Sequence, residues 1–201
     1  MFDVLILGGG VSGISCALVL GSAQKKPFVA NKKIGIISHQ KNSSLQEALI
    51  NNAYGIAPGT LGTELLSKST LHLSNTYPHI VQIENEKVLA IEGKYPEFTV
   101  VTNKNKYAAK MVVVGIGAEN TFAIEGLLHY VEPHQKIPVE KQRIQLKNTD
   151  HKVTEGIYVI GILAGLRSQV AIASGSGAAV ATDILSLWND GIHTQAHDSI
   201  R

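Results

Sequence analysis

The stretch that decides the fold stands near the start of the chain, where Asp3-Val4-Leu5-Ile6-Leu7 runs directly into Gly8-Gly9-Gly10-Val11-Ser12-Gly13. After Asp3 the first run is apolar, as in a buried strand, and residues 14–20 are apolar and rich in small side chains, as in a packed helix. A G-x-G-x-x-G motif between a strand and a helix turns backbone N–H groups and a helix N-terminus towards a diphosphate. The motif therefore predicts a dinucleotide ligand.

Each glycine of the motif has its own physical reason. Gly8 permits the tight turn, Gly10 lets the backbone approach the phosphates, and Gly13 lets the helix pack close to the strand. Glycine-rich turns of this kind also occur without ligands, so a purely structural turn is the alternative. The position of the motif and its apolar flanks favour binding.

Length and composition are those of an ordinary globular protein. The chain has 201 residues, 44% hydrophobic content and a formal net charge of +2, which predicts one domain over residues 1–201. Because the charge is nearly balanced and no basic run with interleaved aromatics is present, we expect neither nucleic acid nor a membrane surface as partner. We expect no signal peptide, because residue 3 already belongs to a strand, and no apolar run of membrane-spanning length. The expected location is the cytoplasm.

Cysteine and histidine give no sign of a metal or dithiol centre. Cys16 is the only cysteine, which excludes an internal disulfide, a C-x-x-C pair and a thiolate zinc cluster, and its helical setting favours a buried structural thiol. His193 and His197 have a metal-pair spacing but stand in a polar tail, so we expect a solvated helix end and no metal. His129 and His134 are expected in an exposed polar loop, with a position facing the ligand as the alternative. Since no residue stands out as a general base, no catalytic residue is assigned.

The apolar pattern alternates between strands and helices, which predicts a doubly wound α/β fold with a parallel sheet and a small β-meander. Residues 80–83, 87–91 and 98–102 follow one another as the meander, with turns near residues 93–94 and 103–105. The continuous apolar run 111–114 is typical of a strand buried on both faces. Further strands are expected at 4–7, 34–37 and 156–161, loops at 40–44 and 51–59, and helices at 13–23, 63–75 (capped by Thr63) and 168–187.

Two features qualify the nature of the dinucleotide. Ser38 and His39 stand at the end of the second strand, where an NAD-binding unit carries an acid for the adenosine ribose. The last helix contains many small residues between Ala171 and Ala179, so something must approach it closely. That neighbour is either another helix or strand, or a cofactor lying across the helix N-terminus.

Taken in order, these features resemble the FAD domain of low-molecular-weight thioredoxin reductases and related flavoproteins. The resemblance covers nearly the whole chain. It implies a three-layer, Rossmann-like FAD-binding domain with FAD as cofactor, and a homodimer formed through that domain. The features that carry it are the turn at 8–13, Lys41-Asn42, residues 52–59, the meander, the strand ending in Gly115-Ile116-Gly117-Ala118, and residues 156–179.

By this resemblance, the FAD-binding residues follow the cofactor from one end to the other. The pyrophosphate would lie on Gly8, Gly10, Val11, Ser12 and Gly13, and the adenosine and its phosphates along Ser38, His39, Lys41 and Asn42. Asn85 matches the strand that reads adenine, and Gly115 and Gly117 match the family's Ala-Thr-Gly turn. Tyr54 and Gly55 match the loop near the flavin ring, Gly161 and Ile162 the ribitol segment, and Gln169, Val170 and Ala171 the segment at the flavin pyrimidine edge.

The chain departs from the family pattern in three places. Ile162 stands where the family has an aspartate that hydrogen-bonds the ribitol. Loss of that hydrogen bond would weaken the binding free energy of the cofactor by roughly 0.5 to 1.5 kcal/mol. Ile116 replaces the threonine of the Ala-Thr-Gly turn. The inserted NADPH domain with its C-x-x-C pair is absent, because residues 119–126 run on quickly to the region before Gly156. This chain alone is therefore not expected to reduce thioredoxin in the usual way.

The leading functional hypothesis is an FAD-dependent oxidoreductase that exchanges electrons through its flavin with a separate partner or a diffusible donor. Neither the donor nor the acceptor can be identified from the sequence. The second hypothesis is a redox-silent FAD- or nucleotide-binding module or sensor, which Ile162 and the missing dithiol favour. A third is an NADP-binding protein with Lys41 near the 2′-phosphate, which the second glycine junction at Gly161 disfavours.

Overall fold

The central sheet is built around its first strand. In the computed structural model, which describes residues 1–39 and 44–196, β1 (Phe2–Leu7) pairs in parallel with β2 (Ile34–Ser38) and with β8 (Lys106–Val114). The sheet continues to β5 (Val81–Glu84) beyond β2, and to β12 (Ile157–Val159) and β11 (Lys152–Thr154) beyond β8. The predicted parallel, doubly wound sheet is confirmed.

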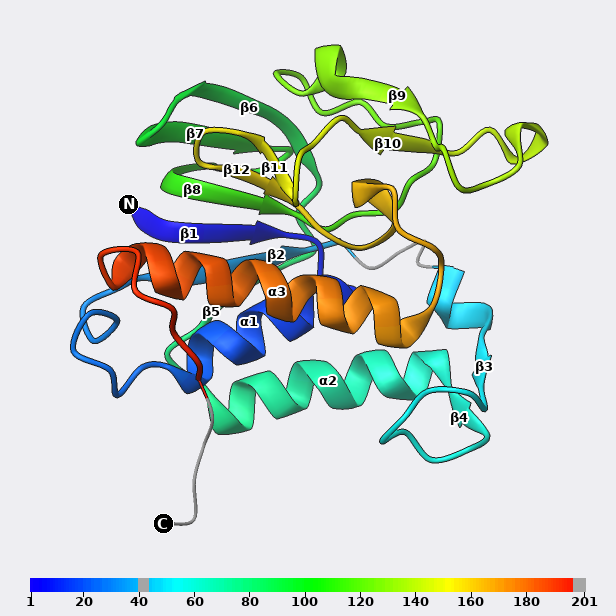
Figure 1. Cartoon of the computed structure of the whole chain (residues 1–201), viewed down its shortest axis with the longest axis horizontal. Coiled ribbons are helices and arrows are strands. Elements are labelled where there is room, and N and C mark those ends of the chain that lie inside the picture. Colours follow the sequence, from blue (N-terminus) through cyan, green and yellow to red (C-terminus); the bar gives the residue numbers. More distant parts are fainter. Residues whose placement is uncertain (40–43, 197–201) are drawn as a thin grey trace.

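Two further layers cover this sheet (Figure 1). On one face lie the helices α1 (Val11–Ser22), α2 (Gly62–Thr76) and α3 (Val170–Trp188). On the other lie β6 (Val88–Lys94), β7 (Glu97–Thr102) and the hairpin of β9 (Val131–Pro133) and β10 (Ile144–Leu146). Shorter elements connect them: η2 (Ser44–Glu47), β3 (Leu49–Ile50), β4 (Thr60–Leu61), η3 (Leu128–Tyr130), η4 (Val139–Lys141) and η5 (Gly161–Ala164).

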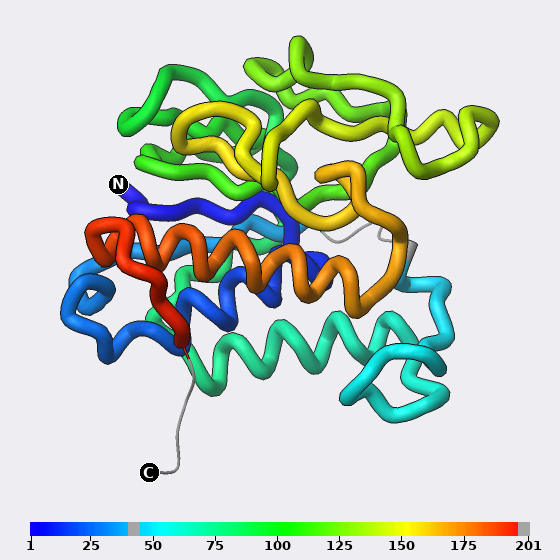
Figure 2. Tube along the Cα trace, viewed as in Figure 1, coloured from blue at the N-terminus to red at the C-terminus, as the bar shows by residue number. Residues whose placement is uncertain are grey.

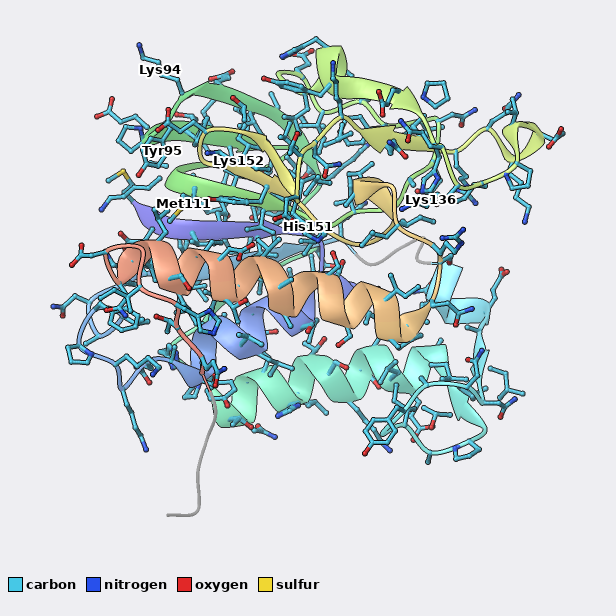
Figure 3. The ribbon with its side chains drawn as sticks, viewed as in Figure 1. Lys94, Tyr95, Met111, Lys136, His151 and Lys152 are labelled. Carbon is cyan, nitrogen blue, oxygen red and sulfur yellow. The ribbon has the colours of Figure 1, made fainter. Side chains whose placement is uncertain are left out.

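Each parallel strand contributes side chains to two hydrophobic cores, because successive side chains point to opposite faces of the sheet. Val4 and Ile6 of β1 pack under the helices, together with Met111 of β8, which is labelled beside β1 in Figure 3. Leu5 and Leu7 pack on the opposite side against the meander. Burial on both faces explains why these strands read as continuous apolar runs and not as alternating ones.

The first and last helices lie side by side although they are far apart in the sequence (Figure 2). Gly177 of α3 faces the backbone of α1 so closely that a Cβ there would overlap the carbonyl oxygen of Ser12. The Ser15 hydroxyl donates to the Ser174 carbonyl across the same contact, at 2.8 Å. The small residues of α3 are thus explained in part by a neighbouring helix, which was one of the two predicted alternatives.

The meander differs from its prediction at both ends. It consists of β6, β7 and β8, whereas the segment predicted as its first strand forms β5 and pairs in parallel with β2. β8 begins at Lys106 instead of residue 111, and its first half pairs antiparallel with β7 while its second half pairs parallel with β1. The β6–β7 turn falls after Lys94, because residues 93–94 still pair with Phe98 and Glu97.

The helices also depart from their expected starts. α1 begins two residues earlier than predicted, at Val11. α2 begins at Gly62, with Leu61 in the N-cap position and no side-chain hydrogen bond, so the predicted Thr63 cap is wrong. A Cβ at Gly62 would overlap the Leu45 carbonyl oxygen, so tight packing against η2 fixes this helix start without a polar cap.

One expectation about membranes needs correction. Within the described residues, α3, with 19 residues, is long and apolar enough to cross a membrane by length and composition. Alanine and glycine keep its composition apolar, and Asp183 is its one charged residue. Val180, Ala181 and Ile184 are nevertheless fully buried in the core under the sheet. Because core helices pass the same test, this is weak evidence for a membrane span.

Candidate functional site

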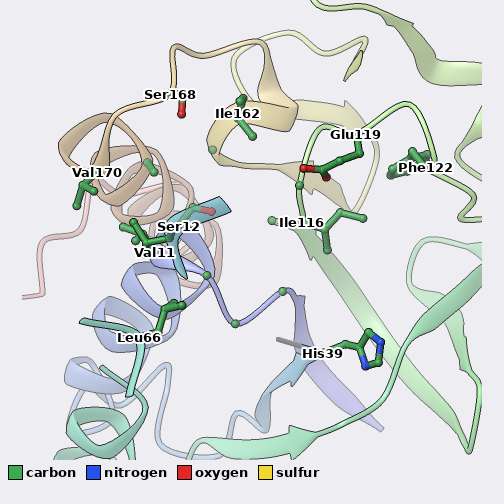
Figure 4. A pocket seen from close by; sticks show the side chains of 18 of the residues that line it. Val11, Ser12, His39, Leu66, Ile116, Glu119, Phe122, Ile162, Ser168 and Val170 are labelled. Atoms are coloured by element: carbon green, nitrogen blue, oxygen red, sulfur yellow. The ribbon is translucent and has the colours of Figure 1, made fainter. Parts of the chain in front are cut away.

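A cavity of about 550 Å³ lies at the edge of the sheet where the parallel strands end. The residues after four of these strands line it: Gly8 after β1, His39 after β2, Gly115 after β8 and Gly161 in η5 after β12. Ligands of open α/β sheets bind outside the carboxyl ends of the strands, and this volume is within the usual range for small-molecule sites. Figure 4 shows the lining side chains, with His39 far from Ser168 and Val170.

The glycine turn after β1 has the geometry that its motif predicts. Gly8 has a φ of 116°, and a Cβ there would overlap the carbonyl oxygen of Gly115. A Cβ at Gly13 would overlap the Gly8 carbonyl oxygen. At Gly10, in contrast, an added Cβ would meet nothing within 4 Å. The first two glycines therefore serve the fold, whereas Gly10 leaves open space on the cavity side.

Two helix N-termini meet at this cavity. Gly10 is the N-cap of α1 and Gln169 that of α3, and neither helix has a side-chain cap in the described part of the chain. Backbone N–H groups in a first helical turn lack partners within the helix and carry a partial positive charge. Val11 and Val170, which begin the two helices, both line the cavity. The residues present therefore fit an anionic dinucleotide: one helix end suits its diphosphate, and a second helix end lies beside it.

The structure brings many of the predicted site residues together, but not all. Gly13 lies behind the turn, and Ser38 ends β2 opposite Glu84, so neither lines the cavity. Asn85 is exposed with a φ of 59°, and its neighbour Glu86 lines the cavity instead. Lys41 and Asn42 lie outside the described residues. The predicted residues that line the cavity are Gly8, Gly10, Val11, Ser12, His39, Gly115, Gly117, Gly161, Ile162, Gln169 and Val170.

Tyr54, Gly55 and Ala171 lie at a second, smaller cavity of about 380 Å³. Val11 and Val170 line both cavities, so the two adjoin at the N-termini of α1 and α3. The Tyr54 side chain is fully exposed in this structure. The predicted approach of this loop to a flavin ring stays a prediction.

Sequence reasoning missed the Glu86 side chain in the cavity wall. Thr102, Asn105 and Tyr107 donate to its carboxylate over 2.5, 2.7 and 2.8 Å. Burial alone would raise the pKa of Glu86, but these hydrogen bonds outweigh burial and lower it. The carboxylate is therefore held ionised as part of the wall. Nothing in the sequence signals this, because the three partners come from the distant β7–β8 hairpin.

His134 corrects the expectation of an exposed polar loop, because its side chain is buried. Its Nε2 lies 3.1 Å from the Ile162 carbonyl oxygen, and its Nδ1 accepts a hydrogen bond from the Lys136 N–H at 3.1 Å. These contacts assign the proton to Nε2. His134 thereby ties the β9–β10 hairpin to η5, whose residues Gly161 and Ile162 line the cavity, and does not itself line it.

The structure confirms the buried setting predicted for Cys16 and the exposed setting predicted for His129. Cys16 is fully buried in α1, and burial raises the pKa of its thiol to about 12, which makes it unreactive. His129 is exposed and packs on Tyr130 with 4.0 Å between the ring centroids. His193 is also exposed, whereas His197 lies outside the described residues. Within the described ranges, no group of His, Cys, Asp or Glu is arranged to hold a metal ion.

Comparison with known proteins gives one family and one fold. The sequence profile described as pyridine nucleotide-disulphide oxidoreductase matches residues 2–173. A thioredoxin reductase from Gloeobacter violaceus superposes with a TM-score of 0.73 at 16% identity, over 100% of this chain and 99% of that one. A ferredoxin-flavin thioredoxin reductase from Clostridium acetobutylicum gives 0.68 at 18% identity, over 94% and 98% of the two chains.

An oxidoreductase from Agrobacterium tumefaciens gives a TM-score of 0.70 at 16% identity, over 92% of this chain and 98% of that one. At these identities the solved structures establish the fold alone. No curated protein matches the chain in sequence.

Proposed function

Because this chain belongs to the pyridine nucleotide-disulphide oxidoreductase family, we propose that it is an FAD-dependent oxidoreductase that exchanges electrons with a separate partner or a diffusible donor. FAD is the cofactor of the family, and the thioredoxin reductase fold is that of a flavoprotein. The observation that carries the proposal is that one cavity is lined by the Gly8–Gly10 turn and by the N-termini of both α1 and α3. Within residues 1–201 we propose one FAD domain.

Each part of the cavity has a task towards this cofactor. The α1 N-terminus and the open space at Gly10 suit the diphosphate. The α3 N-terminus suits the edge of the ring system on which negative charge accumulates during reduction. When bound, FAD supplies the redox chemistry, and the chain supplies its position and electrostatic surroundings.

Two observations support the proposal of a separate electron partner. Cys16 is the only cysteine and its thiol is buried, so the chain offers no dithiol to reduce a disulfide. Residues 115–156 form short hairpins and 3₁₀ turns, with no second glycine-rich strand-to-helix turn among them. On this proposal, electrons enter and leave through the flavin itself.

The absorption spectrum of the purified protein tests this proposal directly. We expect a flavin spectrum between 350 and 500 nm (roughly, as for any oxidised flavin), or its appearance after incubation with FAD and desalting. The spectrum is then followed after anaerobic addition of NADH, NADPH or dithionite, and bleaching followed by reoxidation with an added acceptor would support turnover. A colourless protein that takes up no FAD contradicts the proposal.

A redox-silent FAD module is the second candidate. It is favoured by Ile162, which lines the cavity where the resemblance places an aspartate. In that case FAD binds and dithionite bleaches it, but no reductant from a cell extract does so. Turnover with any electron acceptor would contradict this alternative.

The family resemblance also supports a homodimer, as a proposal of its own. Sedimentation velocity on the FAD-loaded protein measures it. A single species with the mass of one chain would contradict it.

A further inference from the structure

A carboxylate that sequence reasoning did not single out stands in the wall of the cavity. Glu119 follows the Gly115-Ile116-Gly117 turn at the end of β8, and it lines the cavity together with Ile162. In Figure 4 its side chain points into the cavity, towards the side on which Ile162 and Ser12 lie, and far from His39. Glu119 is therefore placed towards the ribitol segment of the predicted site and away from the adenosine end.

The backbone and side chain of Glu119 are both held in place. Its Oε1 accepts a hydrogen bond from Arg143 Nη1 at 2.8 Å, and the backbones of these two residues form a β-bridge. The Ile144 N–H donates to the Ala118 carbonyl oxygen at 3.0 Å beside it. A Cβ on Gly117 would overlap Glu119 Oε2, so the carboxylate lies directly over a residue that has no side chain to displace it.

The free side of this carboxylate has a clear chemical preference. Within residues 1–39 and 44–196, no hydrogen-bond donor reaches Oε2, and the side chain is about half exposed (45%). An ionised carboxylate only accepts hydrogen bonds, so it suits hydroxyl groups and repels phosphates. Arg143 balances its charge. FAD offers uncharged hydroxyls on its adenosine ribose and on its ribityl chain, and Glu119 lies away from His39 at the adenosine end, which leaves the ribityl chain.

We propose that Glu119, held by Arg143, accepts a hydrogen bond from a ribityl hydroxyl of FAD and replaces the aspartate that position 162 lacks. Ile162 and Glu119 then both lie beside the ribityl chain. The acid comes from the segment after β8 instead of the segment after β12. This inference rests on the proposed function, because it requires FAD in this cavity.

The test compares the affinities of FAD and ADP, measured by isothermal titration calorimetry on the full-length apoprotein. ADP carries the adenosine and the diphosphate but no ribityl chain. We expect Glu119→Ala to weaken FAD binding about tenfold and to leave ADP binding within about twofold of the wild type. Glu119→Gln keeps the shape of the side chain and one acceptor oxygen, so its FAD affinity should lie between those of the wild type and Glu119→Ala. In the Glu119→Ala background, Ile162→Asp should recover most of the lost FAD affinity.

Glu140→Ala is the matched control, because Glu140 is an exposed glutamate on η4 that does not line the cavity. It should bind FAD like the wild type. The inference is overturned if Glu119→Ala binds FAD as tightly as the wild type or more tightly, the latter being the result for a carboxylate that repels the diphosphate. Equal weakening of FAD and ADP, or no recovery by Ile162→Asp, overturns it as well. If the wild type itself binds ADP but not FAD, the proposed function fails first.

Discussion

At the scale of single residues, two glycines of one turn have separable roles. Gly8 has a φ of 116°, and a Cβ there would overlap the Gly115 carbonyl oxygen. A Cβ at Gly10 would project into open space. We therefore expect Gly8→Ala to prevent folding or to cost several kcal/mol, on the order of an overpacked core site with a strained backbone. Gly10→Ala should cost at most about 1 kcal/mol, because alanine is a poorer N-cap than glycine.

The variants Gly8→Ala and Gly10→Ala also distinguish an effect on folding from an effect on cofactor binding. A methyl group at position 10 occupies the space into which the diphosphate fits, so we expect Gly10→Ala to fold and to lose FAD affinity by at least about tenfold. Circular dichroism melting gives the stability, and retention of FAD after desalting gives the binding. A Gly10→Ala protein that retains FAD like the wild type would show that the diphosphate lies elsewhere.

A second residue-scale prediction concerns Asp3, a mostly buried carboxylate at the start of β1. Burial would raise the pKa of Asp3, but a hydrogen bond from the Lys33 N–H, a second from Lys110 Nζ and the charge of Lys32 lower it below the ordinary value of 3.8. Because the pKa of the folded state is the lower one, the stabilisation is complete above about pH 4 and is lost as the pH falls through the folded-state pKa.

We expect Asp3→Asn to lower the free energy of unfolding by about 1 kcal/mol at pH 7, with a smaller difference from the wild type at pH 3. Urea denaturation at the two pH values measures it. Asp190→Asn, at an exposed aspartate outside the strands and helices, is the control and should change neither value. A difference that is equal at both pH values would mean that the charge of Asp3 contributes nothing.

Single residues also mark the limit of what the sequence could predict. The glycine turn and the buried Cys16 follow from local patterns, and both were anticipated. The burial of His134 and the position of Glu119 were not, because each depends on a contact between segments distant in the sequence: His134 with Ile162, and Glu119 with Arg143. No local periodicity carries that information.

At the scale of elements, α3 contains two glycines with opposite expected effects. Gly177 packs on Ser12 of α1, whereas Gly175 is exposed and an added Cβ there would meet nothing within 4 Å. We expect Gly177→Ala to destabilise the protein by about 2 kcal/mol or more, because the two helix backbones must separate. Gly175→Ala should stabilise it by up to about 1 kcal/mol, since alanine is the better helix former.

Thermal or urea denaturation of the two variants measures the difference in helix packing directly. The sign of the two effects is the test. A Gly177→Ala variant as stable as the wild type would mean that α1 and α3 are not in close contact in solution.

Element boundaries were the least predictable part of the fold. The run 111–114 has the continuous apolar pattern of a strand buried on both faces. The first half of β8 instead alternates exposed Lys106 and Ala108 with partly buried Tyr107 and buried Ala109, so it carries no continuous apolar run. The sequence places the segment of β5 directly before β6, which favours a meander. In the structure β5 pairs in parallel with β2. Local sequence patterns indicate where a strand lies better than they indicate which strand it pairs with.

At the scale of the whole molecule, the class of the fold followed from the order of the motifs. The alternation of strands and helices predicted a parallel sheet between layers, and the sheet with its two cores agrees. Whether the chain works alone or with a partner belongs to this scale too, and no pattern within one chain carries it.

The cofactor should stabilise the molecule as a whole, because segments as far apart in the sequence as Gly8 and Ala173 line its cavity. With free FAD at about one hundred times its dissociation constant, linkage predicts about 2.7 kcal/mol of added stability, or a rise in Tm of roughly 5 to 10 °C. Differential scanning fluorimetry with a dye that does not overlap flavin emission measures it. Gly10→Ala is the control, and at the same FAD concentration its Tm should rise by about half as much or less, because its affinity for FAD is at least about tenfold lower. An unchanged Tm at saturating FAD would contradict the prediction.

The central position of β1 has a consequence for how the protein is made. β1 and the glycine turn are translated before the elements that complete the site: β8, the neighbour of β1, ends at Val114, and α3, which closes the cavity beside α1, starts at Val170. The nascent chain therefore carries an unfinished cofactor site until α3 has been translated. We expect flavin loading to follow the translation of α3, and we expect a chain truncated before Val170 to lose its cofactor together with this wall of the cavity.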